Sequence, residues 1–324
     1  MQGTEILKVL PESMADAIKK AGPDWERAEE IRIRAKRPLL FYMNNEEYVL
    51  KREGVLVQPE RGRSNNCYIT APEEIEKIID KISGHSLYAY QDELRQGFFT
   101  LEGGHRVGIL GKAVTEEGKI KTLKYLSFLN IRIAHEKKGC GMEIASRLVK
   151  EKRPCHTLIL SPPGCGKTTL LRDLIRLFSD GFDYEEHQKR CWFPGRSIGV
   201  VDERSEIGAS IRGIPTNDLG MRTDLLDGCP KAEGIFLLLR SMAPEMIAVD
   251  EIGSEKDFFA IKKAVNSGCT IFATAHGSSF SELEKKPVFA SFLKENIFER
   301  YVLLSGRRGK GTVEKIETRE ADSI

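Results

Sequence analysis

The first part of the chain changes its hydrophobic pattern near residue 30. Up to residue 23 the apolar side chains recur at helical spacing, which predicts a short helical start interrupted at Pro11. From residue 31 to 51 the apolar positions first alternate and then form two short runs on either side of Asn44–Asn45. This arrangement is typical of strands joined by a hairpin turn.

A well-marked helix follows at residues 70–84. Thr70 can cap it, Glu73 lies three residues further on, and Gly84 ends it. The chain then returns to strands between residues 97 and 123, with glycine-containing turns at 103–104 and 117–118. We therefore expect residues 1–136 to form a small α+β domain.

The pattern changes again after a charged, glycine-containing segment at 135–144, which we take as the linker. Short runs that are apolar at nearly every position now alternate with helical stretches. Such strands are buried on both faces, which predicts a parallel sheet covered by helices and hence an α/β domain over residues 137–324. The runs are TLILS, SIGVVD, MIAVD, TIFATA and RYVLLS.

Two segments of this second domain do not fit the alternation. Residues 179–196 are polar and charged, and we expect a solvated loop or insertion there. Residues 217–234 join the second and third strands and are rich in Gly, Asp and Arg, which favours a structured loop. That loop could contact another subunit or a channel, or it could be an ordinary connection.

Bulk composition narrows the class of protein. A chain of 324 residues suffices for about two domains, and 50 basic against 48 acidic residues argue against a protein that mainly coats nucleic acid. The seven cysteines form no CxxC pair, so we expect reduced thiols and neither a disulfide framework nor zinc. The N-terminus does not resemble a signal peptide, no segment is apolar enough to cross a bilayer, and we expect a cytoplasmic protein.

The segment TLILSPPGCGKTTLL at 157–171 predicts a phosphate-binding loop between a strand and a helix. Gly164 and Gly166 allow backbone amides to approach an anion, and Lys167 can reach the β and γ phosphates. A serine replaces the usual first glycine, where a small residue suffices. The residues expected to bind ATP are Ser161, Pro162, Pro163, Gly164, Cys165, Gly166, Lys167, Thr168 and Thr169.

A second acidic motif, EMIAVDEIG at 245–253, predicts the metal and water sites. Asp250 ends a buried strand and, with the Thr168 hydroxyl, is expected to hold Mg²⁺. Glu251 comes next and faces a different direction, so it can polarise the attacking water. This pair favours ATP hydrolysis over phosphoryl transfer to a small acceptor.

Three features together resemble the secretion and pilus-retraction ATPases. They are an arginine-led Walker B segment that begins at Arg240, an acidic segment at 198–208, and a strand that ends in His276. Four longer segments resemble the stage III sporulation protein AA family of spore-forming Firmicutes. These are LILSPPGCGKTTLLRDLIR, GVVDERSEI, NDLGMRTDLLDGCPKAEG and LLLRSMAPEMIAVDEIGSEKD.

The resemblance covers most of residues 25–305. It implies a RecA-like P-loop ATPase domain, a hexameric ring by analogy, and a cytoplasmic ATPase of the mother cell. Its expected partners are membrane-embedded components of a secretion-like channel. Two alternatives remain: a nucleic-acid translocase that uses the same P-loop ATPase domain, and a nucleotide-gated scaffold without motor function.

The resemblance also implies roles for residues outside the phosphate loop. Either Glu203 or Glu251 activates water, because the acidic segment has Arg204–Ser205 where the family has a proline. His276 either senses the γ-phosphate or is a strand-end histidine bonded to backbone. Five arginines are candidates for stabilising the charge on the γ-phosphate. Arg106 and Arg132 of the N-terminal domain rank highest, and Arg204, Arg222 and Arg240 belong to the ATPase domain. The basic segment 305–311 is expected to be a solvated turn.

Overall fold

The computed structural model describes residues 3–59, 66–84, 86, 90–135, 137–186, 189–309 and 311–319. The chain divides into two compact units, Met1–His135 and Glu136–Ile324. Each unit has its own sheet and its own hydrophobic core.

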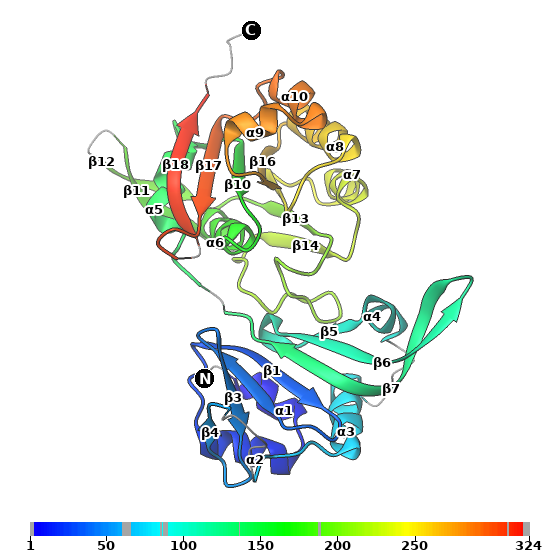
Figure 1. Ribbon diagram of the computed structural model, residues 1–324. Coiled ribbons are helices and arrows are strands. Elements are labelled where there is room, and N and C mark those ends of the chain that lie inside the picture. The colour runs from blue at the N-terminus through cyan, green and yellow to red at the C-terminus, as the bar shows by residue number, and fades with distance from the viewer. Residues whose placement is uncertain are drawn as a thin grey trace. The chain divides into compact units, whose positions relative to one another are not determined.

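Unit 1 consists of an antiparallel sheet with helices on one face (Figure 1). Its elements are α1 (Thr4–Val9), α2 (Glu12–Ala21), β1 (Ala28–Arg34), β2 (Leu40–Met43), β3 (Glu46–Leu50), β4 (Leu56–Val57), α3 (Pro72–Ile82), α4 (Gln91–Gln96), β5 (Phe98–Thr100), β6 (Arg106–Glu116) and β7 (Lys119–Arg132). The strand order is β4-β3-β2-β1-β7-β6-β5.

Alternation along the strands of unit 1 separates a buried face from a polar one. Ile31 and Ile131 are register partners on β1 and β7, both fully buried against α1, α2 and α3. The turn between β2 and β3 has Asn44 and Asn45 at positive φ (53° and 61°), as a two-residue hairpin turn requires. The predicted break at Pro11 is also confirmed, since it separates α1 from α2.

The capping of α3 differs from the prediction by one residue. Ala71 is the N-cap, and the carboxylate of Glu74, not Glu73, accepts from its amide at 2.8 Å. The hydroxyl of Thr70 is buried and has no hydrogen-bond partner. Pro72 fixes the first helical position, and this shifts the cap one residue beyond Thr70.

Unit 2 is a mostly parallel sheet with helices on both faces (Figure 1). Its elements are α5 (Met142–Ala145), β8 (Val149–Lys150), β9 (Arg153–Pro154), β10 (Thr157–Ser161), α6 (Lys167–Asp180), β11 (Gly181–Glu186), β12 (Lys189–Pro194), β13 (Ile198–Asp202), β14 (Thr223–Asp227), α7 (Lys231–Ser241), β15 (Met246–Val249), α8 (Glu255–Asn266), β16 (Thr270–His276), α9 (Phe280–Glu284), α10 (Pro287–Leu293), β17 (Arg300–Ser305) and β18 (Thr312–Thr318).

The sheet order is β14-β13-β15-β16-β10-β17-β18, with only β17 and β18 antiparallel among these pairs. Successive side chains of β10 enter opposite cores: Ile159 packs with α6, whereas Leu158 and Leu160 pack with α7 and α8. Burial on both faces explains why these strands are apolar at nearly every position. The five predicted runs correspond to β10, β13, β15, β16 and β17.

Two segments of unit 2 are more ordered than the sequence suggested. Residues 181–186 and 189–194 form the paired strands β11 and β12, whose Phe182 and Phe193 are buried and contact Phe178 of α6 at ring-centroid distances of 5.1 and 5.0 Å. The expected solvated loop is therefore wrong here, since alternate residues of the hairpin bury aromatic rings. Within 217–234 the chain forms β14, the edge strand paired in parallel with β13.

Candidate nucleotide-binding site

The phosphate loop connects the end of β10 to the start of α6. Gly164 and Gly166 have φ of 73° and 91°, in the left-handed region that glycine tolerates without strain. α6 begins at Lys167, so its unpaired amides face the loop. Ser161 is fully buried at the end of β10, and its hydroxyl donates to the carbonyl of Pro162 at 2.7 Å. A small side chain therefore fits where the usual pattern has glycine.

Lys167 extends from this loop toward the acidic residues. Its side chain is buried, with 5% of the residue exposed, and Nζ lies 3.1 Å from Nδ1 of His276. Burial lowers the pKa of Lys167 below its usual 10.5, while the carboxylates of Glu251 and Asp250 act in the opposite direction. The ammonium group is thus held in a poorly hydrated position that an anion would stabilise.

Asp250 follows the end of β15 and is held by two threonine hydroxyls. Thr168 donates to Oδ2 at 2.6 Å, and Thr274 of β16 donates to Oδ1. The Thr274 hydroxyl also accepts from the amide of Glu251 at 2.8 Å. Thr274 was not anticipated from the sequence, although a fully buried threonine within the apolar run of β16 is the available signal.

The carboxylate of Glu251 is bound at both oxygens. Oε1 lies 2.8 Å from Nε2 of His276, and Oε2 accepts from Nη1 of Arg204 at 2.8 Å. The backbone of Glu251 is left-handed, with φ of 52°, which turns its side chain away from that of Asp250. Lys167, His276, Glu251 and Arg204 therefore form one continuous chain of polar contacts.

Oxygen ligands suited to magnesium are present between α6 and β15. The Thr168 hydroxyl and the Asp250 carboxylate are 2.6 Å apart, and both are hard donors of the kind Mg²⁺ prefers. Among the described residues, no cluster of three or more His, Cys, Asp or Glu side chains could enclose a metal. A two-ligand arrangement fits an ion whose coordination is completed by phosphate and water.

The acidic segment after β13 has a different set of partners. Asp202 is 1% exposed, and its carboxylate accepts from the amides of Glu206, Ile207 and Gly208 at 2.8–2.9 Å. Burial raises the pKa of Asp202, and these three bonds oppose that effect. Glu203 is bonded to Lys231 at the start of α7. Asp202 therefore shapes its own loop, and Glu203 faces α7.

Two arginines of unit 2 make local structural contacts. Arg240 lies in the last turn of α7, where Nε donates to the carbonyl of Phe236 at 3.2 Å. α7 ends five residues before β15 begins, so Arg240 lies near the start of β15. The phosphate loop follows the other end of these parallel strands, after β10. Arg222 donates to the carbonyl of Ser179 at 2.7 Å.

Arg106 and Arg132 are direct register partners on β6 and β7 of unit 1. Their side chains share the polar face of the sheet, and the Arg106 guanidinium lies 4.2 Å from the ring centroid of Phe98. Like charges directly opposite each other on a sheet are unfavourable. On its other side Arg132 faces Glu30, its register partner on β1, so a carboxylate lies beside this pair of arginines.

The turn at 305–311 contacts the phosphate loop. The Gly311 amide donates to the carbonyl of Cys165 at 2.9 Å, so the turn between β17 and β18 is bonded to the centre of the loop. Arg307 and Arg308, in the described part of this turn, are exposed. The prediction of a solvated turn omitted this attachment, which joins residues far apart in the sequence.

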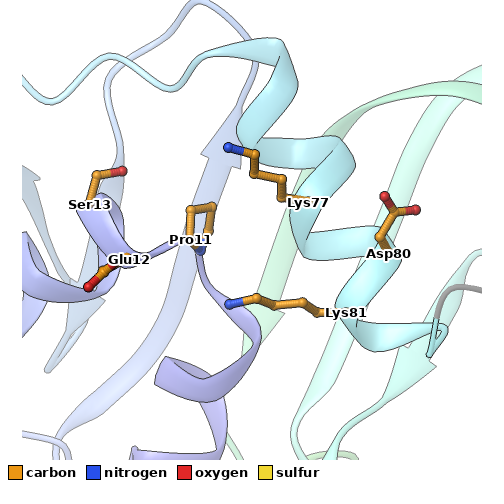
Figure 2. Close-up of a pocket in the computed structure, with 6 residues that line it drawn as sticks. All are labelled: Pro11, Glu12, Ser13, Lys77, Asp80 and Lys81. Carbon is orange, nitrogen blue, oxygen red and sulfur yellow. The ribbon is translucent and has the colours of Figure 1, made fainter.

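Unit 1 has a pocket of about 420 Å³ between the α1–α2 connection and α3, lined by Pro11, Glu12, Ser13, Lys77, Asp80 and Lys81 (Figure 2). Lys81 donates to the carbonyls of Lys8 and Leu10 at 3.3 and 2.6 Å, so it satisfies the C-terminal end of α1. Two lysines and two acidic residues line this pocket, and no glycine-rich loop is among its lining residues. The loop and the acidic residues expected of a nucleotide site occur in unit 2 instead.

No described helix is long and apolar enough to cross a membrane.

Comparisons with known proteins show a family, relatives and solved structures to which this chain is similar. The family model described as sporulation stage III, protein AA matches residues 1–324. Stage III sporulation protein AA of Bacillus subtilis is 39% identical over 321 residues, which cover 99% of this chain and 96% of that protein. Protein SEEDLING PLASTID DEVELOPMENT 1 of Arabidopsis thaliana is 30% identical over 132 residues, 40% of this chain and 17% of that protein.

Among solved structures, the pilus retraction motor PilT with bound ADP superposes with a TM-score of 0.54 at 13% identity, covering 92% of this chain and 77% of that chain. At this identity the likeness shows the fold alone. The predicted fold class, a RecA-like P-loop domain with a smaller N-terminal α+β domain, is confirmed. From its four sequence segments, its fold and its match along the whole length, the chain belongs to the stage III sporulation protein AA family.

Proposed function

We propose that this protein binds and hydrolyses Mg-ATP in unit 2 and uses the cycle to drive or assemble a trans-envelope channel complex during sporulation. The observation that carries the proposal is the meeting of three strand ends beside the phosphate loop. Thr168 contacts Asp250, and Lys167 is linked through His276 to Glu251. The proposed metal ligands thus contact each other, and the proposed phosphate ligand is joined to the base candidate through one histidine.

In this proposal, different residues of unit 2 bind the phosphates, hold the metal ion and activate the water. The loop amides and Lys167 bind the β and γ phosphates, whose negative charge stabilises the buried ammonium. Thr168 and Asp250 hold Mg²⁺, which neutralises phosphate charge when bound. Glu251 orients and deprotonates the attacking water, in preference to Glu203, because Glu251 follows Asp250 and is joined through His276 to Lys167, whereas Glu203 faces α7. His276 connects the base to the phosphate-binding lysine.

In the proposed ring of subunits, a neighbouring copy supplies further positive charge to each nucleotide site. We propose that Arg106 and Arg132, paired on the last two long strands of unit 1, act on nucleotide held by a neighbouring copy, as the resemblance to the secretion ATPases implies. Arg240 lies near the start of the parallel strands, at the opposite end from the phosphate loop. We propose that it reaches a phosphate bound to another subunit. The proposed assembly is a homo-oligomer, hexameric by analogy, that meets membrane-embedded channel components from the cytoplasm of the mother cell.

Turnover against protein concentration tests this proposal. ATPase activity per subunit should rise steeply with concentration and follow a larger species seen by sedimentation with ATP. Wild-type protein that does not bind Mg-ATP would exclude the proposal. Full activity of an obligate monomer would exclude the ring. Several-fold stimulation by DNA would favour a translocase, and a Glu251→Gln variant that works in cells would favour a nucleotide-gated scaffold.

A pull-down identifies the partner. The Glu251→Gln protein, which should hold ATP without cleaving it, is used as bait in extracts of sporulating cells. Lys167→Ala protein at the same concentration is the matched control. Enrichment of a membrane protein by the first bait alone supports the channel role, and equal enrichment by both contradicts nucleotide-dependent assembly.

A further inference from the structure

Arg204 has a position and a contact that the nucleotide site does not yet explain. It lies two residues after the end of β13, and Nη1 donates to Oε2 of Glu251 at 2.8 Å. The contact joins residues 47 positions apart and links the loop after β13 to the end of β15. This loop therefore holds the residue proposed to activate water.

The contact engages the second oxygen of the proposed base. Both oxygens of Glu251 are bound, one by His276 and one by Arg204. A carboxylate held at both oxygens by such partners has fewer acceptor positions left for a water molecule. This geometry restrains Glu251, and the loss of one contact lets the carboxylate bind water more fully.

Exposure indicates which of the contacts is easier to exchange. The Arg204 side chain is 65% exposed, compared with 45% for His276, the other partner of Glu251. Ion pairs with an exposed partner are weak and easily exchanged. A terminal phosphate carries more negative charge than a carboxylate and accepts a guanidinium in a bidentate manner. Arg204 is thus a cation next to the site whose present partner a phosphate can replace.

We propose that Arg204 is a positioning residue that exchanges Glu251 for the γ-phosphate of bound ATP and so frees Glu251 to activate water. This inference rests on the proposed ATPase function. A diphosphate has no γ-phosphate, so ADP leaves the Arg204–Glu251 pair in place. The site thereby links the release of its base to the presence of a triphosphate.

Nucleotide affinity tests the exchange. Calorimetry on the full chain compares ADP with a non-hydrolysable ATP analogue, both with Mg²⁺. Arg204→Ala should weaken binding of the analogue about tenfold and change ADP binding less than twofold, because charge-assisted hydrogen bonds to phosphate are lost only for the triphosphate. Arg204→Lys keeps the charge and should give an intermediate value. Arg212→Ala, an exposed arginine of the same loop region, is the matched control and should match wild type.

A double-mutant cycle shows whether the pair separates. Melting temperatures of wild type, Arg204→Ala, Glu251→Gln and the double variant are measured without nucleotide, with ADP and with the analogue. The single effects should be non-additive in the first two conditions and additive with the analogue. Equal losses for ADP and the analogue, or coupling that persists with the analogue, would mean a fixed structural pair and overturn the inference. Wild-type protein that binds neither nucleotide would instead refute the ATPase proposal.

Discussion

Two strands in the sheet of unit 2 lead into the same three letters, VDE, but the acidic residues there have different partners. β13 leads into Val201-Asp202-Glu203, and β15 leads through Val249 into Asp250-Glu251, each after a buried apolar run. Asp202 is used by three amides of its own loop, and Glu203 pairs with Lys231. The pair after β15 instead contacts the phosphate loop.

Position in the sheet explains this difference. β15 is next to β16, which is next to β10, whereas β13 lies one strand further away. Side chains at the end of β15 can therefore reach Thr168 and His276, and those at the end of β13 mostly meet α7 and their own loop. An identical motif takes its role from its distance to the phosphate loop.

The two lysines that face these strand ends give the largest expected contrast. Lys167→Ala should abolish Mg-ATP binding and lower hydrolysis at least a hundredfold, since the buried ammonium next to Glu251 and Asp250 is the main cation of the loop. Lys231→Ala, which removes the partner of Glu203, should keep both within about threefold. Calorimetry and phosphate release measure the two effects, and comparable losses in both variants would remove the distinction.

The glutamates provide the second contrast. Glu251→Gln should retain nucleotide binding and lose hydrolysis by about a hundredfold or more, as expected when a general base is removed. Glu203→Gln should hydrolyse ATP within about threefold of wild type, because surface pairs contribute little. Single-turnover assays with radiolabelled ATP give the comparison. A larger loss in Glu203→Gln would assign the base to β13.

Thr274 connects both members of the active pair, and Thr157 of the neighbouring strand β10 is its matched control. Both threonines are fully buried, and Thr157 donates only to the carbonyl of Cys155 at 2.8 Å. Each change to valine should lower the free energy of unfolding by about 1–3 kcal/mol. Only Thr274→Val should also reduce kcat, about tenfold, since Asp250 and the Glu251 amide lose their shared partner. Equal activity would show that Thr274 is purely structural.

Asp202 offers the smallest and most specific effect. Its pKa lies above the usual 3.8 because of burial, so the native state binds this proton more readily than the unfolded state. Its contribution to stability is full below the ordinary pKa and is lost as the pH rises through the raised value. The free energy of unfolding of wild type minus that of Asp202→Asn should therefore decrease between pH 4 and pH 8, as measured by urea unfolding. The decrease should be smaller than the loss of stability in Thr274→Val. An increase in this difference with pH would contradict burial as the main cause of the raised pKa of Asp202.

Local patterns were sufficient for much of the fold. The alternation and the Asn44–Asn45 pair located the β2–β3 hairpin, and doubly buried runs located five strands of the parallel sheet. The glycines of the phosphate loop and Asp250 could be identified because their chemistry is fixed by neighbours in sequence. These features depend on interactions within about ten residues.

Features that depend on distant partners could not be read in this way. Thr274 and Arg204 become part of the site only when β13, β15 and β16 lie side by side. The aromatic contacts of Phe178 with Phe182 and Phe193 likewise make an apparently polar segment part of the core. In each case the sequence gives the residue type, and the sheet order determines its partner.

The central place of β10 has a consequence for the order of folding. β10 is the first strand of this sheet in the chain, yet its two neighbours, β16 and β17, come from residues 270–305. During synthesis the strand that bears the phosphate loop must wait for more than a hundred further residues before it is paired on either side. A nascent chain therefore completes the pairing of β10 only after residues 270–305 have been synthesised, and the bond from Gly311 to Cys165 forms later still.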